Sequence, residues 1–105
     1  MRIRKSNIYK KWIEGLRDDR ARYRINARIR RLERGNPGDV EPVGEGISEM
    51  RIHYGPGYRV YYKDTGIEII ILLCGGDKST QKQDITRAKQ IALLPLEEME
   101  LEEEE

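Results

Sequence analysis

The apolar positions near the start of the chain recur every three or four residues, which is the spacing of an amphipathic helix. The first such stripe consists of Ile8, Tyr9, Trp12, Ile13 and Leu16. Ser6 or Asn7 can cap this helix, because a short polar side chain accepts hydrogen bonds from free backbone amides. A second stripe is opened by Asp18 and Asp19 and closed by a left-handed cap at Gly35. The short break between the stripes predicts an antiparallel helical hairpin.

In the second half of the chain the period becomes two, which is typical of strands. Three runs, 47–54, 58–62 and 67–74, are separated by glycine-containing turns and predict an antiparallel meander. Residues 2–5 also alternate and predict a short edge strand. Residues 39–46 are polar and contain glycines, which favours a loop.

A last helical stripe ends before Pro95, and Ser79 or Thr80 can cap it. The predicted fold is α+β, with an N-terminal helical hairpin packed on a three- to four-stranded antiparallel sheet and a C-terminal helix. One domain is predicted for residues 1–95. Residues 96–105 contain seven Glu and no basic residue, which predicts a disordered acidic tail. A sharper hypothesis folds this tail over the basic surface of the domain.

The formal net charge of +1 conceals an uneven distribution. Residues 1–95 hold all 20 basic residues against 12 acidic ones, a charge of +8. Thirteen of the 20 are Arg, whose planar fork binds two phosphate oxygens at once. Five of these fall at spacings of three or four on a stripe beside the apolar one of the second predicted helix, namely Arg17, Arg20, Arg24, Arg28 and Arg31. This pattern favours nucleic-acid binding over a plain solvated surface.

A single cysteine and a single histidine limit the possible chemistry. Cys74 excludes a disulfide framework, and one Cys with one His cannot form a conventional zinc site, so no metal or cofactor is predicted. Cys74 ends an apolar run, where a buried and inert thiol is expected. No apolar run approaches the roughly 20 residues of a membrane span, and the start lacks a signal-peptide core. We therefore expect a cytoplasmic protein with no membrane partner.

Polar residues on the predicted strands form the first candidate site. Alternation predicts that Glu49, Arg51 and His53 share one face of the sheet, and Arg59 can reach that face from the next strand. Such a face is either solvated or suited to handling RNA. His53 is the natural proton carrier, since its ordinary pKa lies near neutrality. An outward-facing tyrosine, such as Tyr54, can stack on a base.

The second candidate site is the turn Gly75-Gly76-Asp77-Lys78-Ser79, which follows a strand and precedes a helix. A nucleotide-binding P-loop needs Gly directly before the Lys, where this chain has Asp77, so nucleotide hydrolysis is excluded. Two readings remain open. The turn contacts phosphate through Lys78, or it is an ordinary strand–helix turn with a capping side chain.

The segments 44–62, 72–81 and 84–89, taken together, resemble the HigB-type branch of the RelE/ParE toxin superfamily, often called addiction-module killer proteins. The resemblance covers roughly residues 6–94. It implies a compact α+β toxin from a bacterial type II toxin–antitoxin pair. Such toxins cut messenger RNA on the ribosome, so the implied partners are mRNA, the ribosome and a helix-turn-helix antitoxin of the HigA type.

Under this resemblance the protein is expected to be a metal-independent endoribonuclease. In the hypothesis for its mechanism, Glu49 or Asp77 is the base and His53 a second proton carrier. Cations bind the phosphate, namely Arg51, Arg59 and Lys78. Further RNA contacts are expected from Arg20, Arg24, Arg28, Arg31, Tyr54 and Ser79. Two alternatives are a non-enzymatic gyrase inhibitor, as in ParE-like relatives, and a degenerate relative that only binds its antitoxin.

Overall fold

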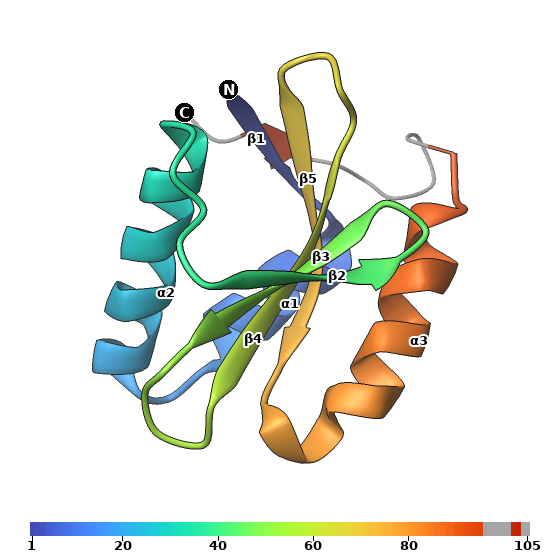
Figure 1. Ribbon diagram of the computed structural model, residues 1–105. Coiled ribbons are helices and arrows are strands. Elements are labelled where there is room, and N and C mark those ends of the chain that lie inside the picture. Colours follow the sequence, from blue (N-terminus) through green and yellow to red (C-terminus); the bar gives the residue numbers. More distant parts are fainter. Residues whose placement is uncertain (96–101, 104–105) are drawn as a thin grey trace.

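The computed structural model describes residues 1–95 and 102–103 (Figure 1). Its elements are, in chain order, β1 (Arg2–Lys5), α1 (Asn7–Gly15), α2 (Asp19–Glu33), β2 (Val40–Gly44), β3 (Ile47–Ile52), β4 (Tyr58–Asp64), β5 (Ile69–Gly76), the short 3-10 helix η1 (Lys78–Thr80), α3 (Gln81–Ala92) and β6 (Glu102–Glu103). Apart from the two residues of β6, the acidic tail predicted for residues 96–105 lies outside the described residues.

Within residues 1–95 the strands form one mixed sheet in the order β2-β3-β4-β5-β1, and β6 pairs with β1 at its edge. The central strands β3, β4 and β5 form the predicted antiparallel meander. β1 runs parallel to β5, with Ile3 opposite Ile70. The predicted three- to four-stranded antiparallel sheet is therefore wrong in strand number and in strand direction. The two-residue alternation of side chains is the same in parallel and antiparallel strands, so it does not predict the direction of a neighbouring strand.

The additional strand β2 lies where the sequence predicts a loop. It pairs with β3, with Val40 opposite Met50 and Glu41 opposite Glu49. Its side chains are exposed or half-buried, and it contains Pro42. Proline and exposed polar residues are characteristic of edge strands, which are held by backbone hydrogen bonds on one side only. A hydrophobic period therefore does not reveal this strand.

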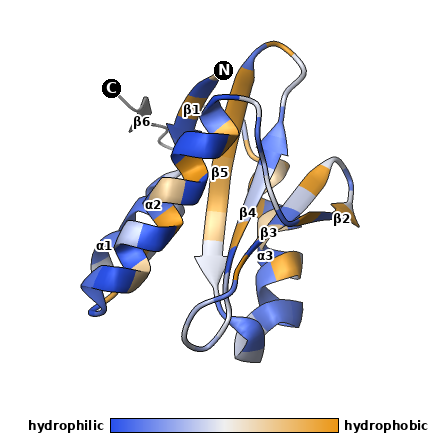
Figure 2. Ribbon diagram, turned by 60° about the vertical axis from the view of Figure 1, so that its left-hand side comes forward, coloured by the Kyte–Doolittle hydropathy of each residue, from blue (hydrophilic) through white to orange (hydrophobic). Residues whose placement is uncertain are grey.

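Two hydrophobic clusters lie on opposite faces of the sheet (Figure 2). On one face, α1 and α2 pack over buried side chains such as Met50 and Leu72. On the other face, α3 packs through Ile91 onto Tyr61 and Leu73. Both faces of β5 are thus covered. Each N-terminal helix packs on the sheet by itself, α1 against β5 and α2 against β3, so the predicted helical hairpin is wrong as a packing unit.

The start of α1 and both ends of α2 form where the capping residues predict them. Ser6 Oγ accepts from the backbone N–H of Tyr9 at 3.0 Å, and Asp18 Oδ1 accepts from that of Ala21 at 3.2 Å. Gly35 ends α2 with a φ of 87°, the left-handed conformation that favours glycine. None of the helices in residues 1–95 has the length and apolar content needed to span a bilayer.

The Gly75-Gly76 pair ends β5 and faces a different helix on each side of the sheet. A Cβ atom on Gly75 would overlap the ring of Trp12 in α1. A Cβ atom on Gly76 would overlap the carboxylate of Asp84 in α3 and come within 2.9 Å of Thr80 Oγ1. The two glycines therefore let both helical layers approach the same strand end. This close packing explains the pair without a bound phosphate.

Candidate functional site

A buried carboxylate, Glu49, lies at the centre of the sheet face that α3 covers. Its side chain is 1% exposed. Its Oε1 accepts a hydrogen bond from Arg51 Nε at 3.1 Å and lies 3.7 Å from Arg59 Nε. Its Oε2 accepts from the Tyr61 hydroxyl at 3.1 Å and from Gln81 Nε2 at 2.9 Å. Because both oxygens are engaged and shielded from solvent, Glu49 holds its neighbours in place and does not take a proton from a substrate.

The strand register explains why the sequence places a carboxylate there. Arg51 of β3 lies directly opposite Arg59 of β4, and like charges in this arrangement repel each other. Glu49 is two residues before Arg51 on the same face, so its charge compensates both guanidinium groups. Tyr61 lies opposite Glu49 in the register, and burial together with the Glu49 charge raises the pKa of the Tyr61 hydroxyl.

Arg59 and Lys78 both lie beside Gly57, in the turn between β3 and β4. Arg59 Nη1 donates to the carbonyl of Gly57 at 2.8 Å. A Cβ atom on Gly57 would lie 3.3 Å from Arg59 Nη1 and 3.5 Å from Lys78 Cβ. Lys78 is exposed, whereas the Arg59 side chain is only 12% exposed. We call the group of Arg51, Arg59 and Lys78 the cationic corner.

Asp77 and Ser79 form a cap beside this corner. The Asp77 carboxylate accepts from the Ser79 backbone N–H at 2.8 Å and from the Ser79 hydroxyl at 2.5 Å. These hydrogen bonds, with a smaller contribution from the charge of Arg59, hold the pKa of Asp77 below its usual value. The capping side chain of this turn is therefore Asp77, and the predicted caps Ser79 and Thr80 give α3 no side-chain cap hydrogen bond. The structure also places a partly exposed, ionised carboxylate next to Arg59.

His53 does not join Glu49 and Arg51, although strict alternation predicts that it should. β3 ends at Ile52, and the His53 side chain is 76% exposed. Its Nε2 lies 2.5 Å from Asp39 Oδ2, and this hydrogen bond lowers the pKa of Asp39. The alternation rule fails here because it holds only while the chain remains extended in the sheet. His53 instead borders a groove beside α2.

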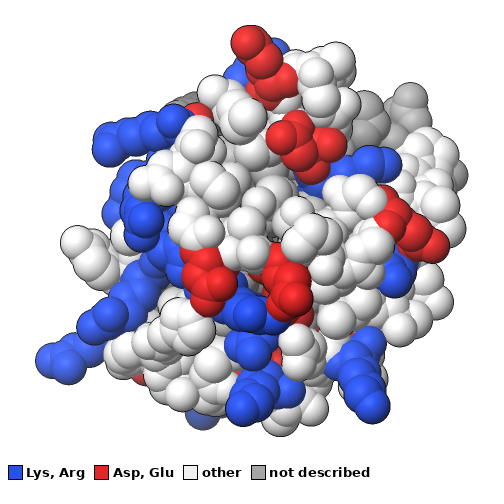
Figure 3. All heavy atoms as spheres, in the orientation of Figure 1, with Lys and Arg blue, Asp and Glu red and all other residues white. Residues whose placement is uncertain are grey.

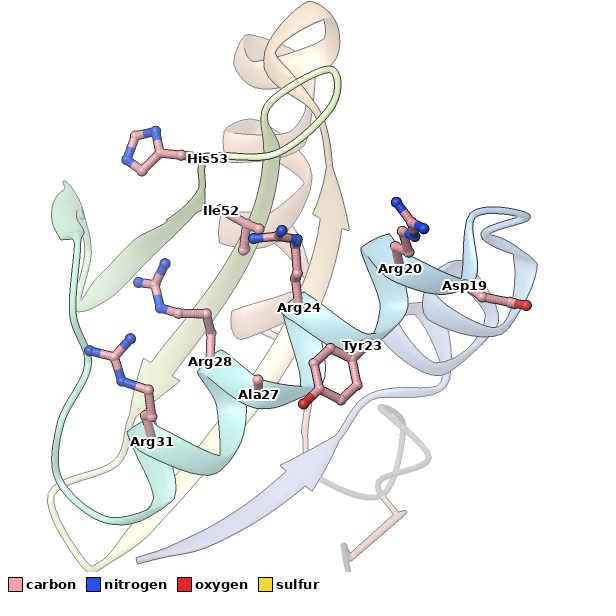
Figure 4. A pocket seen from close by; sticks show the side chains of 9 residues that line it. All are labelled: Asp19, Arg20, Tyr23, Arg24, Ala27, Arg28, Arg31, Ile52 and His53. Atoms are coloured by element: carbon pink, nitrogen blue, oxygen red, sulfur yellow. The ribbon is translucent and has the colours of Figure 1, made fainter.

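That groove, which we call the α2 groove, has a volume of about 770 Å³. Its lining residues come from α2 and the end of β3, namely Asp19, Arg20, Tyr23, Arg24, Ala27, Arg28, Arg31, Ile52 and His53 (Figure 4). Figure 3 shows Lys and Arg side chains gathered over α2 and continuing along the lower part of the same view. The structure thus brings together four of the five arginines that the helical spacing placed on one stripe.

Arg28 and Tyr54, which are among the predicted RNA-contacting residues, have structural partners beside the groove. Arg28 donates to the backbone carbonyls of Arg51, Pro37 and Asp39, the last two at 3.0 and 3.2 Å. Burial lowers the pKa of Arg28. The Tyr54 hydroxyl donates to Asp18 Oδ2 at 3.0 Å, and Arg24 lies over the Tyr54 ring at 4.8 Å from its centroid. Both side chains therefore fix the wall of the α2 groove.

The sequence did not single out four residues of these sites. Tyr61 and Gln81 bind the buried carboxylate, and Asp39 binds His53. Tyr23 lines the α2 groove with 69% of its surface exposed. Only Tyr23 carried a usable signal, since it is an aromatic residue on the arginine-rich side of a predicted helix. The other contacts depend on pairings between distant segments.

Comparison with known proteins identifies the family. No solved structure matches the chain. An "Uncharacterized protein" of Haemophilus influenzae is 49% identical over 92 residues, which cover 88% of this chain and 93% of the relative. The model of the family described as "Phage derived protein Gp49-like (DUF891)" matches residues 11–93. This match overturns the predicted assignment to the HigB-type branch of the RelE/ParE superfamily. The chain belongs to the Gp49-like family of phage-derived proteins, which is linked to the toxins of toxin–antitoxin systems.

Proposed function

We propose that the protein is the toxin of a toxin–antitoxin pair and that it stops translation by cutting mRNA on the ribosome without a metal ion. The family link supports the toxin role. One observation carries the proposed chemistry: Arg59, held by buried Glu49, lies beside exposed Lys78 next to Gly57. Fixed cations of this kind stabilise the charge that develops on phosphorus during cleavage.

The arrangement of the corner favours electrostatic catalysis. The charge of Glu49 compensates the guanidinium groups of Arg51 and Arg59. Lys78 makes no ion pair within residues 1–95, so its positive charge is not compensated. Arg59 is largely buried and restricted in its motion, so little ordering is needed when a phosphate arrives. We therefore assign phosphate binding to the cationic corner and the orientation of its arginines to Glu49.

The proposed reaction is attack of the ribose 2′-hydroxyl on its own phosphate. Asp77 accepts the proton of the 2′-hydroxyl, and Lys78 donates a proton to the leaving 5′ oxygen. The products are a 2′,3′-cyclic phosphate and a 5′-hydroxyl. Because the pKa of Asp77 is low, Asp77 is a weak base, and the larger share of the acceleration falls to the cations.

The proposed partners of the protein are the ribosome, which positions the mRNA, and an antitoxin. The corner lies at the surface, beside an exposed lysine, and the ribosome would supply the positioning of mRNA that such a site lacks. The antitoxin is proposed to be a small helix-turn-helix protein encoded beside the toxin gene. Co-expression of that neighbour should restore the growth of cells that make this protein.

Primer extension on cellular mRNA after induction tests the proposal. Wild type should create new 5′ ends within translated regions, and Arg59→Gln or Lys78→Gln should reduce them at least tenfold. Arg30→Gln and Lys11→Gln remove the same charges from exposed positions on α2 and α1 and should cut normally. Equal cutting by all four variants would place the chemistry elsewhere. Gyrase-linked DNA breaks in place of new RNA ends would show the alternative, a gyrase inhibitor.

A further inference from the structure

The α2 groove has the properties of a track for single-stranded RNA, separate from the cationic corner. We infer that one or two bases stack on Tyr23 while neighbouring arginines contact the phosphates. This inference rests on the proposed function, because it names how the RNA is held on its way to the corner. It differs in its residues, which lie on α2 rather than at the ends of β4 and β5.

The arginines are spaced regularly along the groove. Arg20, Arg24, Arg28 and Arg31 follow α2 at intervals of three or four residues, which corresponds to about 4.5–6 Å along the helix axis. Arg28 is engaged with backbone carbonyls and Arg24 with the Tyr54 ring. Within the described residues, Arg20 and Arg31 form no ion pair, and both are exposed. These two guanidinium groups are therefore the phosphate ligands of the track.

Tyr23 is the feature that points to a nucleobase. Its side chain is 69% exposed, which is high for a large aromatic residue. The adjacent groove position one turn later is Ala27, whose methyl group leaves space beside the ring (Figure 4). An exposed aromatic ring beside a row of arginines is an arrangement on which a base of a single strand stacks while the guanidinium groups contact its phosphates.

The groove suits RNA better than an acidic helix of a protein partner. A helix docks through several apolar anchors in a hydrophobic groove. Ile52 is only 3% exposed, so the accessible apolar surface consists of one tyrosine ring, the Ala27 methyl group and the aliphatic stems of arginines, which end in charged groups. RNA phosphates would bind the arginines, and a base needs only the flat face of one aromatic ring, such as Tyr23, on which to stack. The charge and the shortage of apolar anchors both favour a nucleic acid.

The groove and the corner adjoin at the end of β3. The carbonyl of Arg51 accepts from Arg28 in the wall of the groove, and the Arg51 side chain belongs to the cationic corner. His53 borders the groove at this point. The groove lies on the sheet face that α2 covers and the corner on the face that α3 covers, so a strand lying along α2 reaches the corner by passing around the end of β3, beside His53. This path predicts that the groove contributes affinity and the corner contributes cleavage.

Fluorescence anisotropy with a labelled 2′-O-methyl oligouridine of about twelve nucleotides tests this inference, because that probe cannot be cut by the proposed reaction. Tyr23→Ala should weaken binding about tenfold, and Tyr23→Phe should leave it unchanged. The double variant Arg20→Gln with Arg31→Gln should weaken binding at least tenfold. It should also lower the slope of log affinity against log salt concentration by about 1.4.

A charge-matched control separates the groove from general basicity. Arg30→Gln combined with Arg87→Gln removes two exposed arginines that do not line the groove, and it should change affinity less than threefold. Equal losses in the two double variants, or equal binding by Tyr23→Ala and wild type, would overturn the inference. Circular dichroism of each variant confirms that it is folded.

The binding assay also separates this inference from the proposed function. Arg59→Gln should reduce mRNA cutting in cells at least tenfold and weaken probe binding less than the double variant Arg20→Gln with Arg31→Gln does. A larger loss of probe binding in Arg59→Gln than in that double variant would place the track at the corner and overturn the inference. Groove-dependent binding by a wild-type protein that cuts no mRNA would support the track and contradict the proposed function.

Discussion

Glu49 of β3 and Arg59 of β4 are diagonal neighbours across the two strands, with 3.7 Å between the carboxylate Oε1 and the guanidinium Nε. That nitrogen is buried and has no hydrogen-bond partner within the described residues. The contact is thus an ion pair without a hydrogen bond, in contrast to the 3.1 Å hydrogen bond from Arg51 to the same oxygen. Arg59 is thus held by this charge and by the hydrogen bond from its Nη1 to the carbonyl of Gly57.

Replacing Glu49 by Gln should cost about 3 kcal/mol of unfolding free energy, because it leaves largely buried Arg59 without a compensating charge. Urea denaturation measures the loss. The control is Glu41→Gln, which removes the exposed partner of Arg51 and should cost under about 1 kcal/mol. Similar losses in the two variants would show that Glu49 is an ordinary surface partner.

Replacing Gly75 by Ala should destabilise the fold by about 2 kcal/mol, because the added Cβ overlaps the Trp12 ring. Gly15 is the matched control, since nothing lies within 4 Å of its added Cβ at the end of α1. Gly15→Ala should be neutral or stabilise by up to about 1 kcal/mol. Thermal unfolding of both variants checks the pair. An unchanged midpoint for Gly75→Ala would argue against tight packing of α1 on β5.

The local elements of this fold are predictable from sequence because their signals are local. Asp18 and Gly35 bound α2 through hydrogen bonds and dihedral angles set within a few residues. The period of two in residues 47–74 reports burial on the two faces of the meander. The exposed strand β2 and the parallel pairing of β1 with β5 produce no hydrophobic pattern in the sequence, since both depend on backbone hydrogen bonds between distant segments.

The candidate site was only partly predictable for the same reason. Spacing placed Glu49 and Arg51 on one face, and the structure shows them there. Alternation does not tell which face a helix covers, so the burial of Glu49 under α3 was not foreseen. His53 lies one residue beyond the end of β3, where a rule for extended chains no longer applies. The glycines of the turn indicated phosphate, but they serve helix packing.

Cys74 should react very slowly with a thiol reagent at pH 8 in the folded protein. Its side chain is buried, and burial raises the pKa of the thiol to about 12. Only about one molecule in ten thousand then carries the reactive thiolate at pH 8. Absorbance of a released aromatic thiol measures the rate, with the chain in guanidinium as the fast control. Rapid labelling of the native protein would mean that α3 opens readily from β5.

The N-terminus of α2 should lose its stabilisation in acid. The backbone N–H of Ala21, followed by the Tyr54 hydroxyl, holds the pKa of Asp18 below its usual value of 3.8. Ionised Asp18 therefore stabilises the folded state above about pH 4, and this contribution disappears as the pH falls through the lower folded pKa. Asp18→Asn keeps a capping oxygen but has no charge to titrate. Wild type should exceed Asp18→Asn in its urea midpoint at pH 5, and the gap should close toward pH 2. A gap that stays constant across this range would show that the charge of Asp18 contributes nothing to the cap.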